Sequence, residues 1–143
     1  MTEAGSRKLA RWVGERTVGF FPSVRLYVSR MAIPETISAI TRRRNERKVS
    51  SRGAFWLWNS VLSDFVGQNI PYVIIEPSED IVLRAALLVA GYGLRGYDAV
   101  QLATALSVQM RLDDPASLVF VCSDGDLSKA AKAAGLTTAD PAT

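Results

Sequence analysis

Apolar residues recur at two different spacings along this chain, and each spacing predicts a different element. Continuous apolar runs at residues 25–29 (RLYVS), 72–77 (YVIIEP) and 117–123 (SLVFVCS) predict buried strands. Apolar residues three and four positions apart predict helices over residues 5–15, 31–47, 52–68, 80–90, 98–111 and 126–134. Strands that alternate with helices and are apolar throughout are typical of a parallel sheet with helices on both faces. The expected fold class is therefore α/β.

The helix predicted over residues 52–68 carries most of the aromatic side chains of the chain. Phe55, Trp58, Leu62 and Phe65 fall on one stripe, which we expect to face the core. Trp56 lies off that stripe, on a polar face. An exposed tryptophan there is a candidate contact for a second copy or another partner, and partial burial against a loop is the alternative.

The stretch GYGLRG at residues 91–96 matches the glycine pattern of dinucleotide-binding loops. That pattern requires a strand before the first glycine and a helix that opens at the last one. Here a helix precedes it, so Gly91 is interpreted as the stop of the helix over residues 80–90. A dinucleotide site is not expected.

The chain has 143 residues, of which 48% are apolar and 22% charged, as in an ordinary globular protein. This length suits one compact domain over residues 1–143. No apolar run is long enough to cross a bilayer, and the residues after Met1 do not resemble a secretory signal. Cys122 is the only cysteine, so an intrachain disulfide is excluded and nothing indicates an oxidising compartment. The expected location is the cytoplasm.

The sequence contains no histidine. Histidine general bases, Ser-His-Asp and Cys-His sites and His-ligated zinc are therefore excluded, and one cysteine cannot build a cysteine-rich zinc site. Any chemistry in this chain must rest on carboxylates, which favour hard cations such as Mg²⁺ or Mn²⁺.

Four acidic residues stand where such a cation could bind. Glu35 lies on the opening turn of the helix after the first predicted strand, and Asp98 opens the helix over residues 98–111. Asp124 directly follows the strand over residues 117–123, and Asp126 comes two residues later. Residues just past the ends of parallel strands meet at one edge of a sheet, where a cation would relieve the repulsion between carboxylates. Each acid taken alone is better explained as a helix cap, so the metal site depends on the set of Glu35, Asp98 and Asp124.

A basic run, RRRNERK at residues 42–48, ends the second predicted helix. Positive charge at a helix C-terminus complements the helix dipole and needs no further function. The same run is a candidate phosphate contact, since most contacts to phosphates come from Lys and Arg. The net charge of the chain, +3, is too small to indicate nucleic-acid binding by itself.

Three stretches, in this order along the chain, resemble the PIN-domain family and, within it, the VapC-type toxins of bacterial toxin–antitoxin pairs. They are LYVSRMAIPETISAITRR with Glu35, LRGYDAVQLATAL with Asp98, and FVCSDGDLSKAAKAAGL with Asp124. The stretch with Asp98 is the most specific of the three. The resemblance covers nearly the whole chain, from Gly5 to Leu136.

The resemblance implies a parallel sheet with helices on both faces and an acidic pocket that binds Mg²⁺ or Mn²⁺ and cleaves RNA phosphodiesters. Glu35, Asp98 and Asp124 match acidic positions of the family as catalytic and metal-binding residues, and Asp126 either assists them or caps the last helix. Contacts to the RNA backbone are expected from Arg42, Arg43, Arg44, Arg47 and Arg95. The implied partners are an RNA substrate, an antitoxin that covers the acidic pocket and a second copy of the chain, with no membrane.

The chain departs from the family pattern at two places. Gln101 stands where many relatives carry a histidine, and we expect this change to be tolerated. The family's first strand, which lies at the centre of the sheet and ends in an aspartate, has no counterpart here. We therefore expect Met1 to be an internal methionine of an N-terminally truncated PIN-like domain. As written, such a chain would be poorly stable, rearrange its strand pairing or take up a partner's strand.

Three functional hypotheses follow. The first is a metal-dependent endoribonuclease of a toxin–antitoxin pair. The second is a catalytically inactive PIN remnant that serves as a binding module. The third is an unrelated doubly wound domain in which the acids only cap helices, which a wide separation of Glu35, Asp98 and Asp124 would favour.

Overall fold

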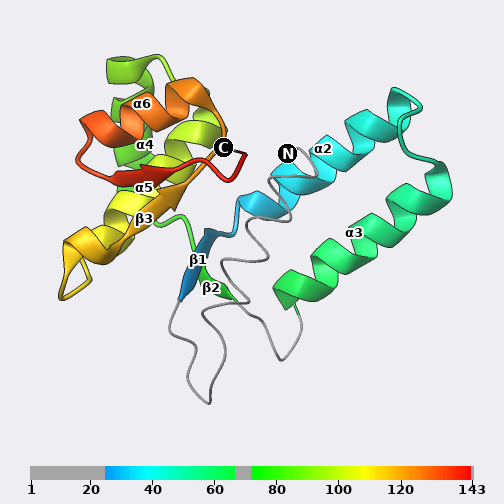
Figure 1. Cartoon of the computed structure of the whole chain (residues 1–143), viewed down its shortest axis with the longest axis horizontal. Helices are drawn as coiled ribbons and strands as arrows, with labels where there is room; N and C mark the ends of the chain where they lie inside the picture. Colours follow the sequence, from blue (N-terminus) through cyan, green and yellow to red (C-terminus); the bar gives the residue numbers. More distant parts are fainter. Residues whose placement is uncertain (1–24, 67–71, 143) are drawn as a thin grey trace. The chain divides into compact units, whose positions relative to one another are not determined.

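The computed structural model describes residues 25–66 and 72–142, which contain five α-helices, four short strands and one 3-10 turn (Figure 1). The chain divides into two compact units. One is Leu26–Pro77, called here the α2–α3 unit, and the other includes Ser78–Thr143 and is called the α4–α6 unit. The helix predicted over residues 5–15 lies outside the described residues.

In the α2–α3 unit, strand β1 (Leu26–Ser29) pairs in parallel with strand β2 (Tyr72–Ile75), Leu26 lying opposite Tyr72. A parallel pair requires a long crossover connection. The crossover contains helices α2 (Ala32–Asn45) and α3 (Ser51–Val66), which form an antiparallel hairpin (Figure 1). All four elements are confirmed close to their predicted positions.

The expected core stripe of α3 is only half correct. Apart from Gly53, the buried and half-buried positions of α3 are Ala54, Trp58, Val61 and Phe65, at helical spacing. Phe55 and Leu62 are exposed instead, the former at 57%. Ala54 has no exposed surface, and its small side chain lets another element approach α3 closely. Trp56, 64% exposed, is on the outer face as expected.

Helix α2 ends in a Schellman motif that contains an arginine where glycine is usual. The N–H of Lys48 donates to Arg43 O and the N–H of Arg47 donates to Arg44 O, both at 2.9 Å. Arg47 has φ +58°, the left-handed region that disfavours residues with a Cβ atom. This turn therefore holds an arginine at a conformational cost.

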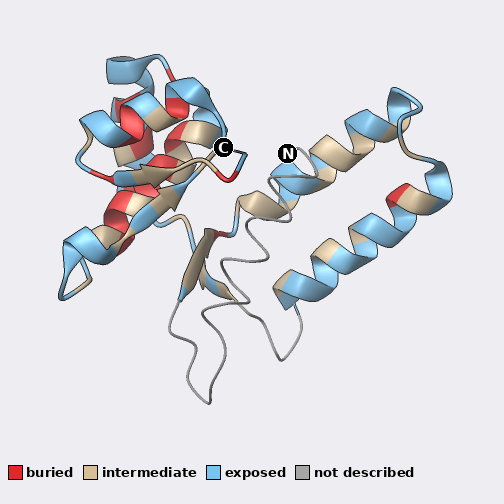
Figure 2. Ribbon diagram, in the orientation of Figure 1, coloured by how far each residue is buried: buried red, intermediate tan, exposed pale blue. Residues whose placement is uncertain are grey.

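The α4–α6 unit contains most of the buried residues (Figure 2). It consists of α4 (Glu79–Tyr92), α5 (Gly96–Gln109), the 3-10 turn η1 (Pro115–Ser117), β3 (Val119–Val121), α6 (Gly125–Ala133) and β4 (Thr137–Ala139). Helix α5 is central, since it packs against both α4 and α6. Strands β3 and β4 pair in parallel, with Val119 opposite Thr137. Strand β4 was not expected from the sequence, because it is short and has no apolar run.

Gly91 does not stop helix α4, contrary to expectation. The helix continues to Tyr92, and Gly93 ends it with φ +65° while its N–H donates to Val89 O at 2.9 Å. Both glycines are compatible with a helix end in sequence, but only Gly93 adopts the left-handed conformation that favours glycine.

Replacing Gly135 by alanine should lower the free energy of unfolding by about 1 kcal/mol. Gly135 has φ +90° and closes α6 in a Schellman motif, in which the N–H of Leu136 donates to Ala131 O at 3.0 Å. Gly91→Ala is the matched control. Gly91 is helical and an added Cβ meets nothing within 4 Å, so alanine there should stabilise by about 0.5–1 kcal/mol. Urea unfolding followed by circular dichroism measures both, and shifts of the same sign would contradict the expectation.

The fold class is α/β with parallel strand pairing, as predicted. The described strands form two sheets of two strands each, β1–β2 and β3–β4, where one continuous sheet was expected. Among the described residues, no helix combines the length and the apolar character needed to span a membrane.

Candidate functional site

Asp98 lies at the third position of helix α5, whose N-cap residue is Arg95. The expectation that Asp98 opens this helix is confirmed, but it is not the capping residue. Its carboxylate lies in the first turn, where negative charge complements the helix dipole. The side chain is half-buried, beside the fully buried Ala99.

The surroundings of Asp98 disfavour its charged form. Burial is the main cause that raises the pKa of this carboxyl above its ordinary value, and the negative charge of Asp124 raises it further. The positive charge of Arg95 acts in the opposite direction. Asp98 and Asp124 are therefore close enough to repel one another, although 26 positions separate them in the sequence.

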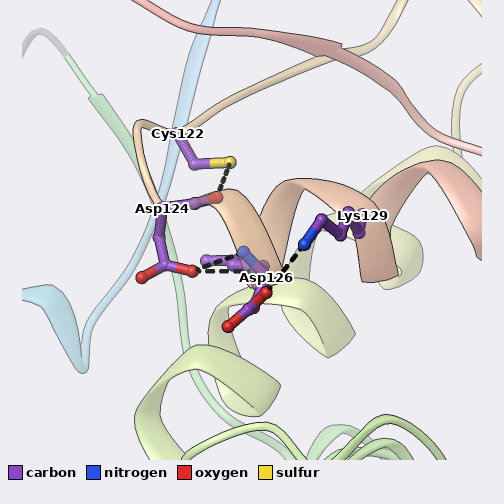
Figure 3. Close-up of polar contacts among 5 residues, drawn as sticks. Cys122, Asp124, Asp126 and Lys129 are labelled. Carbon is purple, nitrogen blue, oxygen red and sulfur yellow. Dashed lines mark hydrogen bonds and ion pairs between the residues drawn. The ribbon is translucent and has the colours of Figure 1, made fainter.

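Asp124 follows strand β3 and caps helix α6 (Figure 3). Its Oδ1 accepts hydrogen bonds from the N–H groups of Asp126 at 3.0 Å and Leu127 at 2.9 Å. The capping interpretation of Asp124 is thus correct. It does not exclude a second role, because both bonds use one carboxylate oxygen and the side chain is exposed.

Asp126 lies in the first turn of α6 and is highly exposed. Its Oδ1 forms an ion pair with Lys129 Nζ at 3.1 Å (Figure 3). A surface pair of this kind contributes little to stability. It also puts a cation of the chain itself in direct contact with this carboxylate.

Asp140 is a further acidic residue near the ends of strands β3 and β4, and it was not predicted from the sequence. It directly follows β4, and because β4 is parallel to β3 it lies beside the residues that follow β3. Its Oδ1 accepts hydrogen bonds from Ser123 Oγ and from the N–H of Ala142, each at 2.8 Å. The available signal was the pair Thr137 and Thr138 before an Asp-Pro step, a short β-branched run that ends in a turn.

Cys122 lies just past β3, half-buried, and its N–H donates to Ala139 O at 3.0 Å. Burial is the main cause that raises the pKa of its thiol, and the charges of Asp124 and Asp140 add to the effect. A thiol whose pKa is raised is a poor nucleophile. Cys122 is therefore poorly suited to nucleophilic chemistry.

Glu35 occupies the first turn of α2, just after β1, as predicted. It belongs to the α2–α3 unit, whereas Asp98, Asp124, Asp126 and Asp140 belong to the α4–α6 unit. The structure therefore brings together Asp98 and Asp124 within one unit, and the inclusion of Glu35 in the same site rests on the family resemblance.

Across residues 25–66 and 72–142, no three His, Cys, Asp or Glu side chains gather as a metal-binding group. The α4–α6 unit instead supplies a carboxylate pair. Mg²⁺ is commonly held by one or two carboxylates, with water and substrate phosphates as its other ligands. Asp98 and Asp124 could supply these carboxylates, and a divalent cation there would stabilise the charged form that burial and repulsion disfavour.

The arginines predicted to contact RNA have different surroundings. Arg42 and Arg43 are exposed in the last turn of α2, and Arg47 is exposed in the turn that follows it. Arg44 is half-buried, and its guanidinium lies over the ring of Trp58, 5.2 Å from the centroid. Arg95 is exposed at the start of α5, next to the acidic pair.

Comparisons with family models, with curated proteins and with solved structures find no match to this chain. The chemistry of its own residues is therefore the basis for a proposed function.

Proposed function

We propose that this protein is a Mg²⁺- or Mn²⁺-dependent endoribonuclease of the PIN type, the toxin of a bacterial toxin–antitoxin pair. The observation that carries the proposal is the pair of Asp98 and Asp124. Two carboxylates from separate helix starts repel one another, and the pKa of Asp98 is raised as a result of burial and of this repulsion. Carboxyl groups held where burial and repulsion disfavour their charged form are typical of cation and catalytic sites.

The residues of the pair have distinct roles in this proposal. Asp98 contributes a negative charge to the cation site from a half-buried position. Asp124 is held in place by the hydrogen bonds to its Oδ1. A divalent cation at such a site activates water and stabilises the charge that develops on a phosphodiester. Arg95 would hold an RNA phosphate near the pair, a role supported by the effect of its charge on Asp98. The resemblance adds Glu35, with Asp126 as an auxiliary acid.

The PIN-like fold is part of this proposal, including a central strand outside the described elements. Among the described strands, β1 pairs only with β2, and β3 only with β4, so each pair has an edge open to a further strand. Parallel sheets of two strands are rare because parallel strands are normally buried within a larger sheet.

The resemblance also supports the partners and the location. A toxin requires an antitoxin, and a cationic side chain of the antitoxin inserted between Asp98 and Asp124 would replace the metal as their counter-charge. The exposed Trp56 supports a contact with a partner, and the resemblance implies association with a second copy of the chain. The RNA substrate places the protein in the cytoplasm.

The test is RNA cleavage and metal binding by the purified chain. With Mn²⁺ we expect fragments of a structured RNA, no fragments in EDTA, and a rise in melting temperature as Mn²⁺ is added, since a ligand that binds only the folded state stabilises it. Ca²⁺, a hard cation of different coordination, is the control metal. A chain that neither cleaves RNA nor responds to Mn²⁺ would contradict the proposal.

A second candidate is a PIN-type binding module without catalysis. It is favoured by the absence of a three-acid group among the described residues, since a lone pair binds a cation more weakly. The same experiment separates the two functions. A module of this kind would bind RNA or its protein partner in EDTA and would leave RNA intact in Mn²⁺.

A further inference from the structure

Positive charge is concentrated where the end of α2, the turn that follows it and the start of α3 meet. Between Arg42 and Arg52 the sequence has six cationic side chains and one acidic side chain, hence a net charge of +5, whereas the whole chain carries +3. The one acid, Glu46, is paired with Lys48 at 2.8 Å. The hydrogen bond from Lys48 and the nearby positive charges lower the pKa of Glu46. This region, residues 42–52, is called the basic turn below.

An exposed aromatic pair lies directly next to the basic turn. Phe55 and Trp56 are 57% and 64% exposed, and their rings are in edge contact with centroids 6.3 Å apart. Arg52 precedes them by three and four residues, so all three side chains share one face of α3. Two adjacent aromatic side chains that are each more than half exposed form an apolar surface that a partner could cover.

The charge of the basic turn decides the kind of partner. A second copy of the chain would bring another turn of charge +5 against the first in a symmetric interface, and like charges oppose such a contact. Nucleic acid supplies the opposite charge. Cationic side chains along a backbone path, together with aromatic rings on which bases stack, are the usual elements of single-strand binding sites.

Single-stranded RNA fits this surface better than a duplex. The bases of a duplex are stacked on one another, so their faces cannot reach Phe55 or Trp56. Arg47 supports the assignment, because it keeps a cation at a left-handed position where glycine would cost less. Arg44 is excluded from the surface, since its guanidinium packs on Trp58.

We propose that the basic turn, with Phe55 and Trp56, binds single-stranded RNA through phosphate contacts and base stacking. The proposal rests on RNA as the substrate class of the proposed function and adds where, and in which form, that RNA is held. The cations involved are Arg42, Arg43, Arg47 and Arg52, all exposed.

The test is the affinity of the full chain for a fluorescein-labelled RNA of about 12 nucleotides, single-stranded or annealed to its complement, measured by anisotropy in EDTA. We expect Trp56→Ala to weaken single-strand binding by about tenfold. We also expect Arg43→Ala to reduce the slope of log affinity against log salt by about 0.7. Single strands should bind about tenfold more tightly than the duplex.

Two matched variants control for these changes. Val66→Ala removes an exposed apolar side chain from the same helix, about 15 Å from Trp56 along the axis, and should leave the affinity unchanged. Arg111→Ala removes an exposed cation from the α4–α6 unit and should leave the salt slope unchanged. Circular dichroism checks that each variant is folded.

Equal binding of single strands and duplex, no RNA binding, or an unchanged affinity of Trp56→Ala would overturn the proposal. So would a Trp56→Ala variant that binds RNA normally but dissociates from dimer to monomer, because the aromatic pair would then be a protein interface. A failure of the proposed function would be seen separately, in the cleavage assay. Single-strand binding that depends on Trp56, without Mn²⁺-dependent cleavage, would remove the nuclease and retain the RNA-binding surface.

Discussion

The variant Asp98→Asn should lose Mn²⁺-dependent RNA cleavage by about 100-fold or more, because removing a direct metal ligand costs at least as much as removing the groups that support one. Asparagine keeps the size of the side chain and its oxygen but not its charge. Since Asp98 and Asp124 form the carboxylate pair proposed to hold the cation, the loss of the Asp98 charge removes one of its main ligands. Initial rates of cleavage at saturating Mn²⁺ measure the effect.

The loss of cleavage in Asp98→Asn should not be accompanied by a loss of stability. The pKa of Asp98 is raised in the folded protein, mainly by burial and then by Asp124, so the folded state binds this proton more tightly than the unfolded state. The resulting stabilisation is present below the unfolded pKa and is lost as the pH rises through the folded pKa. At neutral pH without metal, Asp98→Asn should therefore melt no lower than the wild type. Its stability should also fall less as the pH rises through the acidic range.

The control for this variant is Asp113→Asn, which removes an exposed carboxylate from the loop after α5 in the same unit. It should leave both cleavage and the rise of the melting temperature with Mn²⁺ unchanged. Asp98→Asn should abolish that rise. Cleavage by Asp98→Asn at the wild-type rate would remove Asp98 from the catalytic residues.

The variant Leu102→Ala should lower the free energy of unfolding by about 2–5 kcal/mol. Leu102 has no exposed surface and is one of the largest fully buried side chains among the described residues. It lies on α5 between Ala99, Ala103 and Leu106, which are also buried. Alanines on this face let α5 lie close to its neighbours, so the leucine fills space that the surrounding backbone cannot collapse into. The variant should thus contain a cavity.

Leu87→Ala is the matched control for the core variant. Leu87 is 74% exposed on α4, so the same truncation there should change the free energy of unfolding by less than about 0.5 kcal/mol. Denaturant unfolding followed by circular dichroism is the appropriate measurement for both. Equal losses in the two variants would contradict the assignment of the core.

The helices were predictable because each long element repeats its apolar residues at one period. The face that a helix buries was less predictable. On α3, the stripes through Phe55 and through Ala54 share Trp58 and Phe65, so periodicity alone could not choose between them. The structure buries the stripe that contains Ala54, whose small side chain permits close approach of another element to α3. Gly91 and Gly93 posed the same problem at the end of α4, where the backbone conformation, not the residue type, marks the stop.

The candidate site was predictable in part. The positions of Asp98 and Asp124 at helix starts follow from the ends of the preceding apolar runs, and their proximity follows from packing that no local pattern contains. Asp140 was missed because β4 has only three residues and is recognisable as a strand only by its pairing with β3. A strand of this length has too weak a local preference to be recognised without its partner.

The uneven distribution of buried side chains bears on the energetics of complex formation. Within the described part of the α2–α3 unit, only Ser29 and Ala54 are buried (Figure 2). A segment with so few buried side chains opens locally at a small fraction of the free energy needed to unfold a packed core. Any partner that covers the hairpin also orders it, and part of the interaction free energy is consumed in that ordering. The hairpin would thus form complexes that are specific in contacts yet modest in affinity, and readily reversed.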